Sequence, residues 1–265
     1  MRKEEKYKIA VWILSLVVIL EGAFLFIATR PKKIPKKAKA PAPVVAIKGK
    51  IAIVIDDWGY NLKNLSILEE IKYPLTVSVL PSLSYSRAVS SGLKKKGFEI
   101  ILHLPMEPHE RYRLERDTIM VSMQAAKITE IIGKDLASVQ NVSGVSNHMG
   151  SRATEDERTM EIIFRELKKR GLYFLDSLVS GDSVAPEVAE KIRLKFARRN
   201  IFLDNEEDPV YIKGQLEQLK AASRLHGRAI GIGHDRRVTL QVLKEQMPLL
   251  EKEGYRFVFV SELVE

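Results

Sequence analysis

Two kinds of hydrophobic pattern divide this chain. Residues 9–28 form one long apolar run that is interrupted by a single acid, Glu21. From residue 51 onward, short runs rich in β-branched residues alternate with longer stretches in which apolar residues recur at helical spacing. The first pattern predicts a helix able to cross a membrane, and the second predicts a domain of alternating strands and helices.

The alternating region predicts eight short strands, at residues 51–55, 75–79, 98–102, 144–147, 172–175, 199–203, 229–233 and 256–260. Amphipathic stretches between them, such as residues 62–71, 86–97 and 157–171, predict helices. Strands that alternate with helices of about 10–15 residues form parallel sheets. We therefore expect an α/β fold, a (β/α) barrel of seven or eight parallel strands, with an open doubly wound sheet as the alternative.

The apolar run predicts a membrane anchor. Twenty helical residues span about 30 Å, the thickness of the bilayer core, whereas the apolar core of a signal peptide is shorter; a cleaved signal peptide is the alternative. We expect residues 1–30 to form a cytoplasmic tail and transmembrane anchor, 31–49 a Pro/Ala/Lys-rich spacer, and 50–265 the folded domain. More basic residues follow the run than precede it, which by itself would place the domain in the cytoplasm.

The composition of the chain excludes several classes of function. The 43 Lys and Arg residues exceed the 34 Asp and Glu residues by nine, and the first fifty residues carry that whole excess, with twelve basic and three acidic side chains. The folded domain is therefore neutral, which argues against nucleic-acid binding. The absence of cysteine excludes disulfides, thiolate metal sites and cysteine nucleophiles.

Polar residues follow the ends of six predicted strands. They are Asp56-Asp57, His103 to Glu107, Asn147 to Arg152, Asp176-Ser177, Asp204-Asn205 and His234-Asp235. The carboxyl ends of strands carry the chemistry in such folds, so we expect these groups to meet at one rim. A set of one Asp and two His suits Zn, Mn, Co or Ni.

Some residues of this set are suited to particular chemical roles. Adjacent Asp56 and Asp57 can divide the work, one as metal ligand and one as base, and His234 can protonate a leaving group. Each residue also has a structural interpretation, as a turn, capping or solvated position. That interpretation is strongest for Asp176 and Asp204, and for His109 and His226 outside the set.

In their order, these motifs resemble the divergent polysaccharide deacetylase family. The segments that carry the resemblance are IAIVIDDWGYN (51–61), HLPMEP (103–108), SNHMGSRAT (146–154), LYFLDS (172–177) and GIGHD (231–235). The family is related to carbohydrate esterases that remove acetyl groups from chitin-like and peptidoglycan-like polymers. The resemblance implies a deformed (β/α) barrel and a divalent metal, for which zinc is our first expectation.

The resemblance also implies roles for individual residues. Asp56 corresponds to the general base, Asp57 and His103 to metal ligands, and His234 to the general acid. Deacetylases of the main family carry His-x-x-x-His, but the fourth residue after His103 is Glu107.

The remaining metal ligand is therefore Glu107 or His148. We favour His148, because an imidazole restores the usual ligand set. We expect Arg152 to orient Asp56 or the sugar, and Trp58 to stack on a pyranose face. Supporting positions around the site are Asn147, Ser151 and Asp176.

The expected protein is a single-pass protein of the inner (cytoplasmic) membrane that removes acetyl groups from an envelope polysaccharide such as peptidoglycan. The implied substrate places its domain in the periplasm, against the raw count of basic residues. One alternative is a catalytically inactive barrel that binds glycan or an envelope partner, which the Glu107 substitution favours. Another is a different metallohydrolase such as a phosphoesterase, for which Arg152, Arg236 and Arg237 are available.

Overall fold

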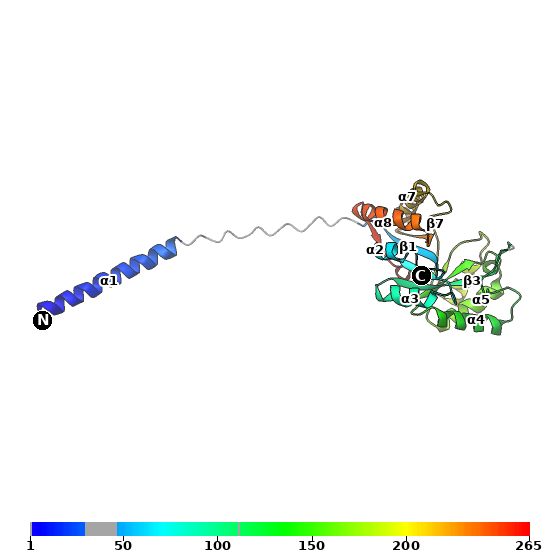
Figure 1. Cartoon of the computed structure of the whole chain (residues 1–265), viewed down its shortest axis with the longest axis horizontal. Coiled ribbons are helices and arrows are strands. Elements are labelled where there is room, and N and C mark those ends of the chain that lie inside the picture. Colours follow the sequence, from blue (N-terminus) through cyan, green and yellow to red (C-terminus); the bar gives the residue numbers. More distant parts are fainter. Residues whose placement is uncertain (1, 30–46, 111) are drawn as a thin grey trace. The chain divides into compact units, whose positions relative to one another are not determined.

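The computed structural model describes residues 2–29, 47–110 and 112–265, which fall into two separate units. The first contains helix α1 (Lys3–Ala28), which buries none of its residues within the protein and has a mean hydropathy of 2.5 over its most apolar 18 residues (Figure 1). Its length and composition fit a membrane anchor or a signal sequence. Most of the predicted spacer lies outside the described residues.

The second unit is one parallel sheet covered by helices. The strands described are β1 (Gly49–Trp58), β2 (Thr76–Val79), β3 (Glu99–Met106), β4 (Gly144–Met149), β5 (Tyr173–Asp176), β6 (Phe196–Arg198), β7 (Ile201–Phe202), β8 (Arg228–His234) and β9 (Tyr255–Phe257). Their order is β6-β5-β4-β3-β2-β1-β8-β7, and β9 pairs with β1.

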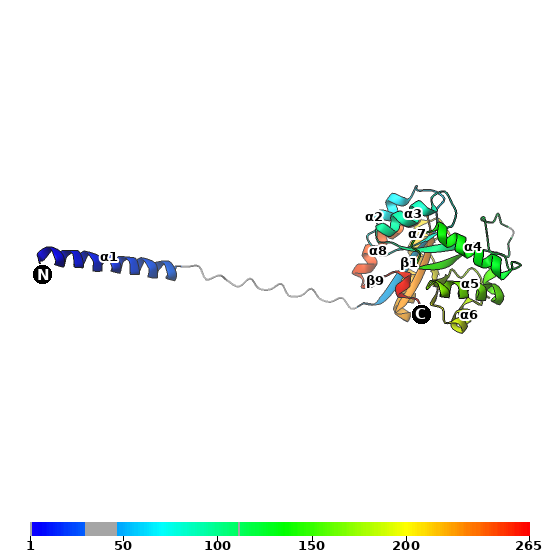
Figure 2. The same cartoon turned by 90° about the horizontal axis from the view of Figure 1, so that it is seen from below.

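Helices lie on the outside of this sheet (Figures 1 and 2). They are α2 (Leu65–Glu70), α3 (Ser86–Lys95), α4 (Ala125–Ser138), α5 (Glu157–Lys169), α6 (Ala185–Ile192), α7 (Pro209–His226) and α8 (Arg237–Lys252), with 3₁₀ turns η1 (Ala153–Glu155) and η2 (Val260–Glu262). This arrangement confirms the prediction of a deformed (β/α) barrel. All eight predicted strands are present, and β6 is an additional short strand whose sequence, Phe-Ala-Arg, contains no apolar run.

The barrel stays incomplete between β6 and β7, since no ladder joins these two strands within residues 112–265. The two residues that link them bridge the gap instead. The amide of Arg199 donates to the carbonyl of Asp176 in β5 at 3.0 Å, and the amide of Asn200 donates to the carbonyl of Ile230 in β8 at 2.9 Å.

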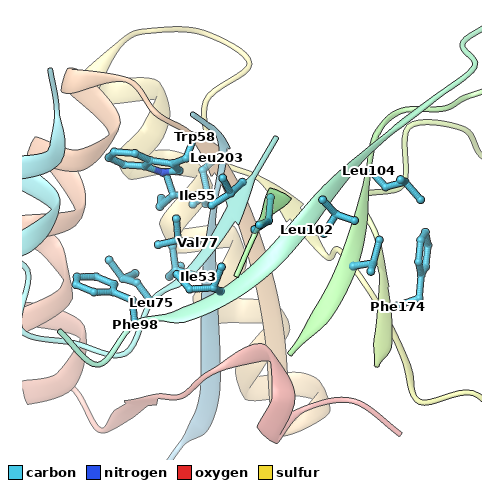
Figure 3. Packing of buried hydrophobic residues seen from close by; sticks show 14 of the residues in the cluster. Ile53, Ile55, Trp58, Leu75, Val77, Phe98, Leu102, Leu104, Phe174 and Leu203 are labelled. Atoms are coloured by element: carbon cyan, nitrogen blue, oxygen red, sulfur yellow. The ribbon is translucent and has the colours of Figure 1, made fainter. Parts of the chain in front are cut away.

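Strand alternation creates two hydrophobic cores. Along β1, Ile51, Ile53 and Ile55 face the helices and belong to the outer core, which Figure 3 shows in part. Ala52 and Val54 face the barrel interior, where they pack with apolar residues of β3, β5, β8 and the C-terminal segment. A polar residue that follows Ala52 and Val54 in the same alternation therefore points into the barrel.

Candidate metal centre

Three of the predicted site residues continue the inward-facing phase of their strands. Asp56 follows Ala52 and Val54 in β1, while His103 in β3 and His234 in β8 each lie two residues beyond an inner-core residue. Asp56 and His234 are also direct partners in the β1–β8 register. Alternation and register together bring these side chains to the carboxyl-terminal mouth of the barrel.

Asp57 reaches the same mouth through an irregularity in β1. In a regular strand, Asp57 would point away from the face that Asp56 occupies. However, the β1–β2 register shifts between Ile55 and Trp58, and Asp57 has a left-handed backbone conformation with φ of 67°. Such a conformation costs a non-glycine residue on the order of 1–3 kcal/mol and is concentrated at functional sites. The irregularity allows two adjacent acids to serve one site.

Asp57, His103 and His148 form the candidate cation site. Oδ1 of Asp57 lies 3.4 Å from Nε2 of His103 and 3.2 Å from Nδ1 of His148, and the three ligand atoms all lie within 4.8 Å of one another. Ligands about 2.1 Å from a tetrahedral cation are separated from each other by about 3.4 Å. Oδ1 of Asp57 is buried and has no hydrogen-bond partner, so the donor set and spacing fit a divalent metal.

Two buried serines orient His103. Nδ1 of His103 lies 2.9 Å from the hydroxyl of Ser146, which lies 2.8 Å from the hydroxyl of Ser78. This contact leaves Nε2 of His103 for the cation, as is usual for ligating imidazoles whose second nitrogen is hydrogen bonded. No sequence pattern indicates this contact, because serines are common inside strands.

Asp56 is a buried acid beside the candidate cation site. It is 2% exposed, its Oδ2 lies 3.6 Å from Nε2 of His103, and its Oδ1 has no hydrogen-bond partner. Burial raises the pKa of Asp56, although the nearby His103 and His234 oppose the shift. At Asp57, burial acts in the same direction, but the contacts with His103 and His148 outweigh it and hold the pKa of that acid below its usual value.

His234 is held by Asp204, for which the sequence pattern also allows a turn or capping position. Nδ1 of His234 lies 2.8 Å from Oδ1 of Asp204, and Oδ2 of the fully buried Asp204 accepts from the His234 amide at 2.8 Å and the Thr239 hydroxyl at 2.7 Å. Burial alone would lower the pKa of His234, but the bond to Asp204 outweighs burial and raises it. This pair leaves Nε2 available to donate a proton.

Glu107 and Arg152 pair with each other, outside the cation site. Oε1 of Glu107 accepts from Nη1 of Arg152 at 2.8 Å, and Oε2 accepts from the Val121 amide at 2.6 Å. Glu107 is therefore not in the group of potential ligands described above. Arg152 therefore pairs with Glu107 through Nη1, and its side chain is half exposed. The expected role of Arg152 in orienting Asp56 or the sugar stays a prediction.

The expectation that Trp58 stacks on a pyranose is also wrong. Trp58 is fully buried and belongs to the outer core, where it lies beside Ile55 and Leu203 (Figure 3). The irregularity at Asp57 places its neighbour Trp58 on the helix-facing side of the sheet, so no face of the indole is open to a ligand.

The three supporting residues shape loops around the mouth. Asn147 donates to the carbonyl of Met149 and accepts from the amide of Ser177, each at 2.8 Å, which fixes the turn after His148. The carboxylate of Asp176 accepts from the Leu178 amide and the Ser183 hydroxyl, each at 2.8 Å. The hydroxyl of Ser151 accepts from the amide of His109 at 2.9 Å.

Comparison with known proteins agrees with this arrangement. The sequence profile of the family described as divergent polysaccharide deacetylase matches residues 53–264. An uncharacterized protein of Haemophilus influenzae is 34% identical over 197 residues, which are 74% of this chain and 70% of that protein.

Solved structures share the fold. An uncharacterized protein from Agrobacterium tumefaciens superposes with a TM-score of 0.79 at 25% identity, over 83% of this chain and 90% of that one. The catalytic domain of a peptidoglycan N-acetylglucosamine deacetylase from Eubacterium rectale superposes with a TM-score of 0.50 at 13% identity, over 79% and 87% of the two chains. The second likeness concerns the fold alone.

Proposed function

This chain belongs to the divergent polysaccharide deacetylase family, and from that premise we propose that it is a metal-dependent hydrolase that removes acetyl groups from a carbohydrate of the cell envelope. The observation that carries the proposal is the cluster of Asp57, His103 and His148, whose carboxylate oxygen is buried without a hydrogen-bond partner. Peptidoglycan-like polymers of N-acetylated sugars are the proposed substrate class, as in the deacetylase from Eubacterium rectale that shares the fold.

In this proposal, Asp57, His103 and His148 hold a divalent cation, with zinc as the first choice. When bound, the cation polarises the acetyl carbonyl and the attacking water. Ser146 keeps Nε2 of His103 directed toward the cation by engaging Nδ1 at 2.9 Å. Two imidazoles and one carboxylate leave coordination positions open, as catalytic sites require.

The protein's own proton transfers fall to two residues on neighbouring strands. Asp56 accepts the proton of the attacking water, for which its buried position and unpartnered Oδ1 are suited. His234 donates a proton from Nε2 to the departing amine. Asp204 supports this step, because its bond to Nδ1 raises the pKa of His234 and so keeps the imidazole protonated to higher pH.

The test is acetate release by the full-length chain, purified in detergent and loaded with zinc. The substrates are N-acetylated chitotetraose and peptidoglycan fragments, and the readout is free acetate together with new amine groups. Removing one acid–base group typically costs about 10²–10⁴-fold in rate. We therefore expect losses of that size for Asp56→Asn and His234→Ala, with zinc content unchanged.

One outcome would favour the catalytically inactive barrel instead. If the zinc-loaded protein binds these glycans but releases no acetate from any of them, the site is a recognition site without turnover. If it neither binds nor hydrolyses them, the proposed substrate class is wrong.

We further propose that α1 anchors the protein in the inner membrane with the folded unit on the extracytoplasmic side, where the proposed substrates are found. A C-terminal reporter that is active only outside the cytoplasm tests this topology. Activity of a cytoplasm-specific reporter at the same position would contradict it.

A further inference from the structure

Tyr60 is an exposed aromatic residue in the loop after β1, the strand that carries Asp57. It lies two residues beyond the end of β1, and 48% of its surface is exposed. Burial of the phenol, its hydrogen bond to Glu115, and the charges of Glu115 and Asp57 raise the pKa of Tyr60. Because Tyr60 follows the carboxyl end of β1, it lies in a loop at the mouth of the barrel.

The backbone on both sides of this ring is fixed by neighbouring segments. The carbonyl of Trp58 accepts from the Leu80 amide at 2.9 Å, and the carbonyl of Gly59 accepts from the Tyr85 amide at 3.1 Å. Gly59 has φ of +124°, and a Cβ at this position would meet Oγ of Ser86 at 3.0 Å. The turn that presents Tyr60 therefore has a defined conformation that depends on glycine.

The far end of the ring is fixed as well, because the Tyr60 hydroxyl donates to Oε1 of Glu115. Glu115 belongs to the loop that follows β3, and this loop is fastened at its base. Met106 pairs with Ile119, and the Glu107 amide donates to the Ile119 carbonyl at 2.9 Å. The hydrogen bond thus joins the end of the strand that carries Asp57 to the loop after the strand that carries His103.

We propose that Tyr60 is the stacking platform for a pyranose ring of the acetylated glycan, held in place by Glu115; this proposal rests on the proposed deacetylase function. The C–H face of a pyranose is apolar and packs against aromatic rings, which combine a large contact area with few rotatable bonds. A ring already fixed at both ends loses little conformational entropy on binding. Its position in the loop three residues beyond Asp57 would hold one sugar ring at the mouth that contains the cation site.

The experiment measures binding of N-acetylated chitotetraose to the full-length, zinc-loaded protein in detergent by calorimetry. The background is Asp56→Asn, so that turnover is slow during the titration. Tyr60→Ala should raise the Kd about tenfold, which corresponds to about 1.4 kcal/mol. Tyr60→Phe keeps the ring but loses the bond to Glu115, so it should raise the Kd only about two- to threefold. Glu115→Ala removes the acceptor of the same bond and should act in the same way.

Tyr73 provides the matched control. Its hydroxyl also donates to a glutamate, Glu251, at 2.8 Å, but it lies before β2, at the opposite end of the barrel from the cation site. Tyr73→Phe should leave the Kd unchanged. Zinc content and the thermal midpoint of each variant separate a lost platform from a lost fold.

The outcomes separate the two proposals. If Tyr60→Ala retains zinc, fold and unchanged affinity for the glycan, the platform is refuted and the deacetylase proposal stands. If the unsubstituted protein binds no acetylated glycan, the proposed substrate class fails and the platform fails with it. Equal losses in Tyr60→Ala and Tyr73→Phe would assign the effect to general destabilisation, which also overturns the platform.

Discussion

Buried polar groups lie at both ends of the barrel interior, and the two ends differ in the hydrogen-bond donors that these groups receive. At the amino-terminal end, Glu99 is 4% exposed, and its Oε2 accepts from the Thr76 hydroxyl at 2.7 Å and the Ser261 amide at 3.3 Å. The Thr76 hydroxyl in turn accepts from the Val260 amide at 3.2 Å. The C-terminal segment thus supplies one donor to this carboxylate and a second to the Thr76 hydroxyl that is bonded to it.

At the mouth, Asp56 and Asp57 each have a buried Oδ1 without a hydrogen-bond partner. A buried acceptor left unpaired costs roughly 1–3 kcal/mol. Within the barrel interior, the fold therefore supplies hydrogen-bond donors to Glu99, whereas it leaves Oδ1 of Asp56 and Oδ1 of Asp57 without one. This difference separates Glu99, a structural carboxylate, from the two acids of the candidate site.

The largest expected effect tests whether the mouth is a metal site. His148→Ala removes one of three ligands, and we expect the zinc affinity to fall at least about 100-fold, since even loss of a residue that only supports a ligand costs about 10–100-fold. Chelator competition and mass spectrometry of bound metal measure the change. Glu107→Gln is the matched control, because Glu107 already has two hydrogen-bond donors, and its zinc affinity should stay within about threefold.

The opposite pattern of zinc affinities would contradict the comparison between carboxylates with and without hydrogen-bond donors. Undiminished zinc in His148→Ala together with lost zinc in Glu107→Gln would transfer the ligand role to Glu107. A carboxylate that the structure supplies with hydrogen bonds would then be functional, and unpartnered oxygens would no longer mark the site.

The second prediction concerns Asp204, whose carboxylate has hydrogen-bond donors although it lies near the mouth. Asp204→Asn should lower the deacetylation rate about 10–100-fold with zinc content unchanged, because His234 loses the negative charge that stabilises its protonated form. The pKa of His234 is raised by Asp204, so activity that needs protonated His234 falls as the pH rises through that pKa. In Asp204→Asn this alkaline limb should move to lower pH.

Asp208→Asn is the control for this variant. Asp208 accepts from the Tyr211 amide at 2.8 Å as the N-cap of α7, and asparagine caps equally well. Its rate and pH profile should match those of the unsubstituted protein. An unshifted alkaline limb in Asp204→Asn would show that His234 is not the group that titrates.

The hydrophobic pattern was sufficient to predict the barrel and part of its mouth. Alternation in β1, β3 and β8 predicts the inward direction of Asp56, His103 and His234, because each continues a phase set by buried neighbours. The strand β6 escaped prediction because the pairing of Phe196–Arg198 with β5, rather than an apolar run, defines it.

The remaining features depend on contacts between residues far apart in the chain. The left-handed backbone at Asp57 reverses the direction expected for its side chain, and the next residue, Trp58, becomes core instead of ligand surface. Asp204 stands in an acidic stretch that is typical of a turn, and its bond to His234 spans 30 residues. Arg152 meets Glu107 across 45 residues, which no local pattern indicates.

The third prediction tests the amino-terminal end. Thr76→Val keeps the shape of the side chain but removes the donor to Glu99 and the acceptor of the Val260 amide. Leaving such groups unpaired should lower the free energy of unfolding by about 1–3 kcal/mol, measured by urea unfolding in detergent, with the acetate-release rate within about twofold. Ser261→Ala is the control: Ser261 contacts Glu99 through its backbone amide, so its stability should not change. A large loss of activity in Thr76→Val would contradict the division between the two ends.

The smallest expected effect is a gain in stability, and it concerns the mouth of the barrel in the metal-free protein. Because burial raises the pKa of Asp56, the folded state binds more protons than the unfolded state between the ordinary and the raised value, and stability falls as the pH rises through that range. Asp56→Asn has no charge to bury, so the metal-free protein should gain about 1 kcal/mol at pH 7, an increase of the size seen when a functional site is relaxed. The gain should shrink near pH 4, whereas the loss in Thr76→Val should be the same at both values. Urea unfolding in the presence of a chelator measures all four quantities, and a destabilised Asp56→Asn at pH 7 would show that the mouth, like the amino-terminal end, had been compensated by the fold.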